Sequence, residues 1–393
     1  MRRPRLVHVT TTDMSLALLL GPQLGAFADA GFEVIGASAP GSYVSQIEAL
    51  GVQHISLRNT TRSMAPHRDV AAMLELRRLF VELQPDVVHT HNPKPGVYGR
   101  IAARAARVPA IVNTVHGLYA LPEDPLVKRT VVYGLEAIAG RCSHAELVQN
   151  PEDLARLERL GLGPKLRLLG NGIDLARFQP ARISSRDVER VRAEIGAGAD
   201  DIVCGLVGRL VWEKGYHEVF EAAARLVERM PRLRFVVVGP EDTAKQDSVS
   251  RADLRKAERD ANITFLGDRL DVDVIYRALD LYVLASYREG FPRSAMEAAA
   301  MGLPIVATNI RGCRQVVDHD VTGLLVPPRD AQALAEAIEV LAGDPDRRTR
   351  MGEAASVKAR HEFDQDRVID VTLETYHRLL DQQARHGRIG EPT

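Results

Sequence analysis

The sequence predicts an α/β protein with two domains, each a doubly wound parallel sheet covered by helices. Short apolar segments rich in β-branched residues alternate with amphipathic segments of about ten to fifteen residues, as in βαβ units. The apolar segments are nearly uninterrupted, which is typical of parallel strands covered on both faces. The chain has 393 residues, 45% hydrophobic and 26% charged, which suits two or three ordinary globular domains.

The elements follow one another in regular order. In the first half, strands are predicted at residues 5–9, 32–38, 85–91 and 110–117, and helices at 22–31, 44–51 and 97–108. In the second half, strands are predicted at residues 201–210, 234–239, 263–267, 281–286, 303–308 and 323–327, with a helix at 216–230. A polar stretch punctuated by Gly, Asn and Pro separates the halves, and a long amphipathic helix ends the chain. We therefore expect domains at 1–175 and 176–365 and a separate terminal helix at 366–393.

Composition excludes several classes of protein. The formal net charge of −1 gives no bias toward nucleic acid. The three scattered cysteines form no disulfide framework, which favours a reducing cytosol. No secretory signal and no apolar run near about 18 residues is present, so we expect a cytoplasmic protein without a membrane span.

Two charged motifs follow strands of the second half at their carboxyl ends, where ligands bind in such sheets. In "GRLVWEKG", Arg209 and Lys214 precede a helix, a position that suits an anion. In "EGFPRSAMEAAAMG", Pro292 marks a helix start, so Glu289 lies in the turn and Glu297 inside an apolar helix. A carboxylate at Glu297 suits a vicinal diol such as a ribose, because a buried carboxylate needs partners. The alternative is a solvated turn and a surface helix.

Taken together, these motifs resemble glycosyltransferase family 4, whose members are retaining, nucleotide-sugar-dependent transferases. "GLPIVAT", "NGID" at 171–174 and "VTGLLVPPRD" at 321–330 also match, and the likeness extends over nearly the whole chain. It implies the GT-B fold: two Rossmann-like doubly wound domains facing across a cleft, with the C-terminal helix crossing back to the first domain.

The resemblance also implies roles for single residues. Arg209 and Lys214 are expected to bind the donor diphosphate and stabilise the leaving nucleoside diphosphate, and Glu297 to hold the ribose. Glu289, in the loop, is expected to face the donor sugar, and His116 to contact the reaction centre; these two and the two cations form the expected catalytic set. The expected donor-binding residues are Arg209, Lys214, Gly267, Arg269, Glu289, Gly290, Phe291, Pro292 and Glu297.

The first half is expected to bind the acceptor. Many members of the family carry a Gly-Gly loop after the first strand, but this chain has "TTTDMS" at 10–15, with Thr12 and Asp13 as candidate acceptor contacts. "HTHNPKPG" and "NTVHG" follow strands and add His91, Lys94 and His116 as further candidates. For His116 the alternative is a structural strand-end histidine. The spacing of His89 and His91 is compatible with a metal, but the sequence supplies no evident third ligand.

A basic stripe is predicted on the helix at 97–108, because Arg100, Arg104 and Arg107 recur at helical spacing. Lys128 and Arg129 lie beside apolar residues further on. Such a surface suits an anionic lipid membrane or a phosphorylated acceptor, or it is merely solvated. "VHTHNPKPG" and "NTVHG" resemble the branch of the family that acts on polyprenyl-diphosphate-linked glycans.

The sequence therefore predicts a glycosyltransferase that moves a hexosyl or N-acetylhexosaminyl group from a nucleotide-sugar, expected to be a UDP-sugar, to a glycan or lipid-linked acceptor. Cell-surface polysaccharide synthesis is the expected context, with peripheral contact to the inner membrane surface. The alternatives are a soluble acceptor, such as an inositol phosphate or a natural-product aglycone, and a non-catalytic nucleotide-sugar-binding subunit. No cofactor and no metal are expected. Asp271 and Asp273 form a literal DxD, but they precede a helix and suit its N-terminus.

Overall fold

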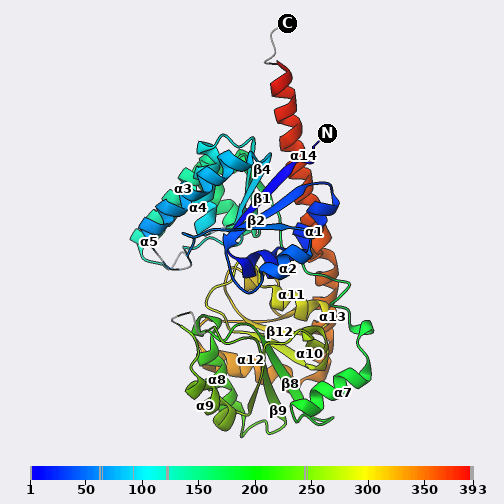
Figure 1. Cartoon of the computed structure of the whole chain (residues 1–393). Coiled ribbons are helices and arrows are strands. Elements are labelled where there is room, and N and C mark those ends of the chain that lie inside the picture. The colour runs from blue at the N-terminus through cyan, green and yellow to red at the C-terminus, as the bar shows by residue number, and fades with distance from the viewer. Residues whose placement is uncertain are drawn as a thin grey trace. The chain divides into compact units, whose positions relative to one another are not determined.

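The computed structural model describes residues 2–61, 63, 65–91, 93–120, 124–242, 245 and 247–389, with side chains as far as residue 385 of the last helix. The chain forms two compact units (Figure 1). Unit 1 comprises Met1–Gly170 and Asp366–Thr393, and unit 2 comprises Asn171–Gln365.

Unit 1 contains a seven-stranded sheet in the order β3-β2-β1-β4-β5-β6-β7, with all neighbours parallel. Its strands are β1 (Arg5–Thr12), β2 (Glu33–Ala39), β3 (Gln53–Ser56), β4 (Val87–His91), β5 (Ala110–Val115), β6 (Ala145–Val148) and β7 (Leu166–Leu168). Its helices are α1 (Gly21–Asp29), α2 (Val44–Ala49), α3 (Pro66–Leu83), α4 (Lys94–Ala105), α5 (Leu126–Cys142), α6 (Pro151–Leu157) and α14 (Gln365–Ile389).

The sheet of unit 1 is covered on both faces because successive strand residues point to opposite sides. Leu6 and Val87 belong to one apolar cluster, whereas their neighbours Val7 and Val88 belong to another. The first cluster is completed by α14, which contributes Ile369, Tyr376 and other side chains. The C-terminal helix therefore packs on the first unit, as the sequence predicts.

Unit 2 contains a six-stranded parallel sheet in the order β10-β9-β8-β11-β12-β13. Its strands are β8 (Ile202–Val207), β9 (Leu233–Val238), β10 (Ile263–Gly267), β11 (Leu281–Leu284), β12 (Ile305–Thr308) and β13 (Gly323–Val326). Its helices are α7 (Ser185–Glu194), α8 (Tyr216–Leu226), α9 (Arg251–Ala261), α10 (Val272–Ala278), α11 (Arg293–Ala300), α12 (Ala331–Gly343) and α13 (Pro345–Glu362). Both faces are again apolar: Val283 joins one cluster, and Tyr282 and Leu284 join the other.

The predicted fold class is confirmed, since both halves form doubly wound parallel sheets. The pattern of apolar runs misses β3, β6 and β7, which are short and carry polar residues. In β6 the polar residue is Glu146, which is fully buried.

The predicted basic stripe on α4 is wrong at Arg100. This side chain is fully buried and donates hydrogen bonds to Glu146 (2.7 Å) and Glu136 (2.5 Å), in β6 and α5. Arg104 and Arg107 are exposed. The helical spacing is real, but α5 and the sheet cover the face that carries Arg100.

Candidate active site

Two loops of unit 2 that follow β8 and β11 lie against each other. The N–H of Tyr287 donates to the carbonyl of Glu213 at 3.0 Å. Gly215 has a φ of +77°, and a Cβ there would lie 2.0 Å from the carbonyl oxygen of Ala285. Only glycine fits this close approach without strain. The sequence "EKG" thus brings Lys214 beside the loop that carries Glu289.

Lys214 and Glu289 form an ion pair. The lysine Nζ lies 2.6 Å from Oε1 of Glu289, and Ser286 donates to the same oxygen at 2.7 Å. Both charged side chains are mostly covered, with 24% and 13% of their surface exposed. Partial burial weakens solvent screening, so the pair holds both groups in defined positions.

Arg209 also has an acidic partner, since its guanidinium lies 2.5 Å from Asp242 in the loop after β9. Both cations that the sequence predicts for a diphosphate therefore lie just beyond strand ends, each paired with a carboxylate. An anionic ligand at this edge of the sheet would compete with these carboxylates for the same donors.

Glu297 lies within α11, and Pro292 occupies the position before its first residue, as predicted. Its Oε2 accepts a hydrogen bond from the hydroxyl of Tyr276 at 3.1 Å. Burial raises the pKa of Glu297, while Arg293 and the tyrosine lower it. Tyr276 lies in α10 and is itself fully buried, so its hydroxyl holds the carboxylate in a fixed position.

The loop before α11 is held through its backbone. Asn171 donates to the carbonyl of Phe291 at 3.1 Å, and Phe291 packs edge-on against Phe363. A Cβ on Gly312 would lie 2.6 Å from the carbonyl of Glu289, so a second turn presses on this loop. These contacts fix Gly290, which lies between the two held residues.

A pocket of about 590 Å³ opens beside the strand ends of β9 and β10. Gly267 and Asp268 line it from one loop, and Gly239 and Pro240 from another. The side chain of Arg269 instead makes ion pairs with Asp271 at 2.8 Å and Glu194 at 2.6 Å. Of the two donor-binding residues predicted in this loop, Gly267 therefore borders the pocket, whereas Arg269 ties the loop to α7.

The literal DxD at 271–273 lies at the N-terminus of α10, as expected. Asp271 stands at the N-cap position, and the hydrogen bonds from Arg269 lower its pKa to about 2. Asp273 is in the first turn and pairs with Arg177 at 3.3 Å.

In unit 1, the loop after β1 is built around Asp13. This buried carboxylate accepts from the N–H of Met14 (2.8 Å) and from that of Tyr43 (2.7 Å), which lies just before α2. Thr12 contacts the hydroxyl of Ser15 at 3.3 Å. Asp13 thus ties two loops together at the carboxyl edge of the sheet.

Lys94 begins α4 and is also engaged. Its Nζ lies 2.5 Å from Asp69 and donates to the carbonyls of Thr61 and Ser63 at 3.0 and 2.8 Å. The lysine joins α4 to the loop before α3.

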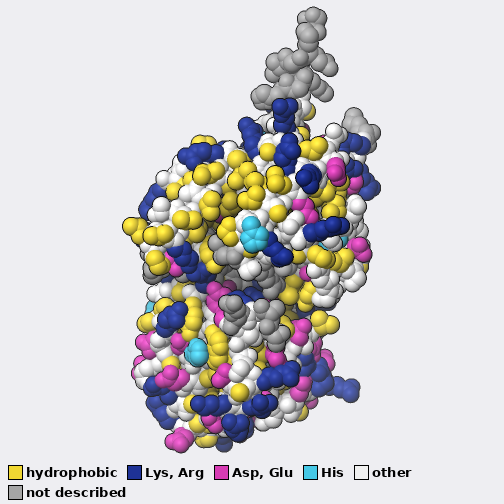
Figure 2. All heavy atoms as spheres, turned by 60° about the vertical axis from the view of Figure 1, so that its left-hand side comes forward, with side chains coloured by type: hydrophobic (Ala, Val, Ile, Leu, Met, Phe, Trp, Pro, Cys, Tyr) yellow, Lys and Arg dark blue, Asp and Glu magenta, His cyan; other side chains and the backbone are white. Residues whose placement is uncertain are grey.

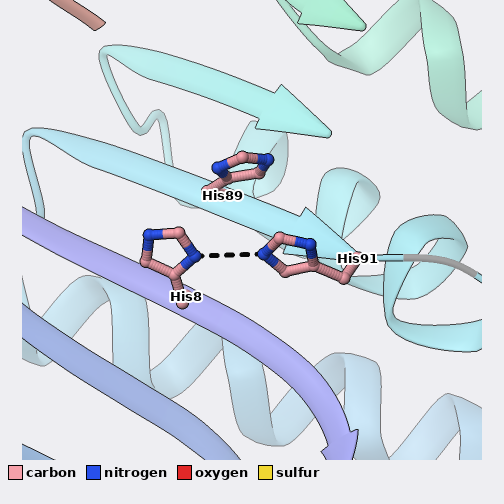
Figure 3. Close-up of side chains that lie close together, drawn as sticks. All are labelled: His8, His89 and His91. Carbon is pink, nitrogen blue, oxygen red and sulfur yellow. Dashed lines mark hydrogen bonds between the residues drawn. The ribbon is translucent and has the colours of Figure 1, made fainter. Parts of the chain in front are cut away.

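His91 and His116 lie together at the carboxyl ends of β4 and β5. His91 Nδ1 is 2.9 Å from His116 Nε2, and His91 Nε2 is 3.0 Å from His8 Nδ1. Figure 3 shows His8, His89 and His91 side by side, from β1 and β4. One nitrogen from each ring lies within 4.8 Å of the other two, so His8 is the third imidazole that the sequence did not identify.

Several partners escaped the sequence reasoning: Ser286, Asp242, Tyr276, His8 and Tyr376, whose hydroxyl lies 2.5 Å from Nδ1 of His89. The signal for His8 is a histidine in an otherwise apolar strand. The other four lie in ordinary polar or amphipathic contexts, and only the fold brings them to the predicted residues.

Comparison with known proteins identifies the class. A model described as "Glycosyl transferases group 1" matches residues 187–358, and one described as "Glycosyl transferase 4-like" matches residues 14–141. The structure of Anabaena HepE in complex with UDP and glucose superimposes with a TM-score of 0.79 at 22% identity, covering 94% of this chain and 98% of that one. The protein is a glycosyltransferase with the GT-B fold.

Two curated relatives refine the class. The "UDP-Gal:alpha-D-GlcNAc-diphosphoundecaprenol alpha-1,3-galactosyltransferase" of Escherichia coli is 32% identical over 70% of this chain and 71% of its own length. A "D-inositol 3-phosphate glycosyltransferase" of Pseudarthrobacter chlorophenolicus is 30% identical over 81% of this chain and 77% of its own. The chain belongs to glycosyltransferase family 4. Among the residues that the structure describes, no helix is long and apolar enough to cross a membrane.

Proposed function

We propose that this protein is a metal-independent, retaining glycosyltransferase that moves a hexosyl or N-acetylhexosaminyl group from a UDP-sugar to a polyprenyl-diphosphate-linked glycan. The observation that carries the proposal is the group of Arg209, Lys214, Glu289 and Glu297 beyond the strand ends of unit 2. HepE, which has the same fold, binds UDP, and the Escherichia coli relative takes an acceptor on diphosphoundecaprenol. Assembly of cell-surface polysaccharide at the cytoplasmic face of the membrane is the proposed setting.

The two cations supply the main chemical contribution. When the bond between the anomeric carbon and the diphosphate oxygen breaks, negative charge grows on the leaving group. Arg209 can donate two parallel hydrogen bonds to it, and Lys214 adds a point charge. Fixed donors of this kind stabilise the transition state without the cost of reorganisation.

The carboxylates hold the donor in place. Glu297, anchored by Tyr276, accepts hydrogen bonds from the two ribose hydroxyls, and Glu289 faces the sugar. The acceptor oxygen bonds to the anomeric carbon on the face that the diphosphate leaves, and its proton passes to the departing phosphate oxygen. Glu289 is therefore a positioning and electrostatic residue in this scheme, not a covalent nucleophile. The pocket bordered by Gly267 receives the uracil.

The surface of unit 1 favours an acceptor held at a membrane. Helix α5 turns Glu136 inward to Arg100 and presents an apolar stripe outward (Figure 2). The exposed members of the stripe are Leu126, Val127, Val131, Leu135 and Ile138, with Val127 77% exposed. A contiguous apolar stripe of this kind marks an interaction site.

Basic groups gather at the C-terminal end of the same helix. Lys165 donates to the carbonyls of Gly140 and Arg141 at 3.1 and 3.2 Å. The charges of Arg104 and Arg141 both act on Lys165, and burial together with these charges lowers its pKa. An apolar stripe that can insert among lipid chains, next to a cluster of basic groups, suits a bilayer with anionic headgroups.

The donor half of the proposal is tested by release of UDP from a panel of UDP-sugars, with and without a chelator. Lys214→Ala should lower kcat/KM by roughly a hundredfold or more, the range for loss of one charge-stabilising donor. Lys245→Ala is the matched control, because Lys245 pairs with Glu213 in a neighbouring loop and should leave the rate unchanged. No release from any UDP-sugar, or loss of release with the chelator, would contradict the donor or the metal-independence claim.

The acceptor half is tested by flotation with liposomes that contain or lack anionic lipid. The wild-type protein should float with anionic vesicles, and the pair Val131→Asp and Ile138→Asp should remain in the aqueous phase. Val340→Asp and Val357→Asp are control changes at exposed valines of α12 and α13. Flotation of neither protein would favour the alternative of a soluble acceptor, for which the inositol phosphate enzyme of Pseudarthrobacter chlorophenolicus is the precedent.

A further inference from the structure

A continuous chain of hydrogen bonds connects His116 to the C-terminal helix through the interior of unit 1. His116 Nε2 is 2.9 Å from His91 Nδ1, and His91 Nε2 is 3.0 Å from His8 Nδ1 (Figure 3). His8 Nε2 is 3.4 Å from the hydroxyl of Tyr376, which lies on α14. The same hydroxyl is 2.5 Å from Nδ1 of His89. We call the series Tyr376–His8–His91–His116 the histidine relay.

The imidazoles of the relay are neutral at pH 7. Burial lowers the pKa of His8 to about 3 and that of His116 to about 4. Burial, and then the neighbouring histidines, lower the pKa of His91 well below its usual range. A neutral imidazole has one N–H donor and one acceptor nitrogen. At each contact in the relay, therefore, one ring must donate and the other must accept.

This rule couples the tautomers. If His116 carries its proton on Nδ1, then His91 and His8 must each donate from Nδ1, and Tyr376 must donate to His8. If His116 carries its proton on Nε2, every step is reversed. The relay therefore has two self-consistent arrangements, and a change at one end is felt at the other.

Further contacts hold the end of the relay that lies on α14. The hydroxyl of Tyr376 is also 2.5 Å from Nδ1 of His89, whose Nε2 is 2.8 Å from the hydroxyl of Thr114. These contacts orient the tyrosine hydroxyl, so this end of the relay selects one of the two arrangements.

A metal is the competing interpretation of the cluster, and two features argue against it. The rings of His89 and His91 are stacked, with centroids 4.4 Å apart and planes 24° apart. Lone pairs lie in the ring plane, so those of stacked rings run in nearly parallel planes and do not converge on one ion. Both ring nitrogens of His8, of His89 and of His91 also have a hydrogen-bonding partner already.

We propose that Tyr376, His8 and His91 are positioning residues that hold His116 in a single neutral tautomer. The inference rests on the proposed role of His116 at the reaction centre. Because Nε2 faces His91, a fixed tautomer gives the other ring nitrogen, Nδ1, one defined role in hydrogen bonding.

The test reads the tautomer directly. In protein with ¹⁵N-labelled histidine, a long-range ¹H–¹⁵N spectrum distinguishes protonated from unprotonated ring nitrogens. In wild-type protein at pH 7, His116 should show a single tautomer, with one ring nitrogen protonated and the other unprotonated. Tyr376→Phe keeps the ring that packs on Phe27 and Phe32 but removes the hydroxyl. It should convert the His116 signals to a mixture and lower kcat roughly tenfold with an unchanged KM for the donor, the effect typical of lost outer hydrogen bonds.

Two further variants keep the test decisive. His91→Gln interrupts the relay in the middle and should also mix the tautomers of His116. Tyr133→Phe removes a hydroxyl elsewhere in unit 1 and should change neither the spectrum nor kcat. A mixture of tautomers on wild-type His116, an unaltered spectrum in Tyr376→Phe and His91→Gln, or a stoichiometric transition metal in the purified protein would overturn the relay. Because the spectrum needs no turnover, a chain that transfers no sugar would refute the proposed function alone.

Discussion

Replacing Arg100 by methionine should destabilise unit 1 severely. Arg100 and Glu146 are fully buried and Glu136 is 4% exposed, and the one guanidinium serves both carboxylates. Removing one partner of a buried ion pair costs about 3–5 kcal/mol, because the remaining charge stays buried without compensation. Here two carboxylates are left, although Glu146 keeps the donors Asn113 and Ser143. We expect the upper end of that range, a large share of the roughly 5–15 kcal/mol that stabilises a domain.

Urea denaturation followed by two probes measures this effect. The chain has a single tryptophan, Trp212, in unit 2, so its fluorescence reports on that unit, whereas far-UV circular dichroism follows both. Arg100→Met should therefore shift the unfolding of unit 1, seen by circular dichroism, to lower urea concentration. It should leave the transition seen by tryptophan fluorescence, which reports on unit 2, unchanged. Arg104→Met is the control, because it makes the same change at an exposed site of the same helix and should cost less than about 0.5 kcal/mol.

The pH dependence gives a second signature. Burial already raises the pKa of Glu136, and loss of the guanidinium should raise it further. A folded-state pKa above the unfolded value means that the folded state takes up protons as the pH falls. The loss of free energy of unfolding in Arg100→Met, relative to wild type, should thus be largest at pH 8 and smaller at pH 5. A deficit under about 1 kcal/mol, or one independent of pH, would refute the reasoning.

Three further outcomes are expected. Gly215→Ala should lower the stability of unit 2 by about 1–3 kcal/mol, because a Cβ clashes at a positive φ, whereas Gly343→Ala, in open space, should be neutral in the same fluorescence-detected urea titration. Glu297→Gln should raise the KM for the donor roughly tenfold or more, the worth of a charged hydrogen bond, and an unchanged KM in initial-rate measurements would contradict the ribose role. His8 and His116 have pKa values of about 3 and 4, so both stay neutral in the folded protein, whereas the same histidines in the unfolded chain take up protons below about pH 6.5. Lowering the pH from 7 to 5.5 should therefore reduce the free energy of unfolding by about 1 kcal/mol for each histidine, and equal urea midpoints at both pH values would exclude this.

The parallel sheets could be predicted from the sequence because apolar runs and helical periods are local signals. The start of α11 at Pro292 and the placement of Arg209 and Lys214 after a strand are local in the same way. The environment of a side chain, in contrast, is formed by residues that are distant in the sequence. The spacing of Arg100 and Arg104 predicts a shared side of a helix, but only α5 and β6, further along the chain, decide that one of them is buried.

The partners of the predicted site residues were missed for the same physical reason. His8 and His91 are 83 positions apart, and His89 and Tyr376 are 287 apart. An apolar helix around Glu297 indicates that a partner must exist, because an uncompensated buried carboxylate is costly. It does not indicate that the partner is Tyr276. Composition and period thus locate the elements, and the tertiary fold alone assigns the contacts.

Burial explains why the two polar systems differ. In unit 2, the ion pair of Lys214 and Glu289 retains some exposure, so an anionic ligand can replace the carboxylate on the lysine at modest cost. In unit 1, the imidazoles of His8 and His91 are buried, and charging any of them would require desolvating an ion, so they stay neutral. A neutral relay carries no net charge, but the direction of one of its hydrogen bonds fixes the direction of the others, since each ring must donate on one side and accept on the other. In the proposed mechanism, charge stabilisation and proton placement are therefore separate tasks, carried by residues whose exposure suits each.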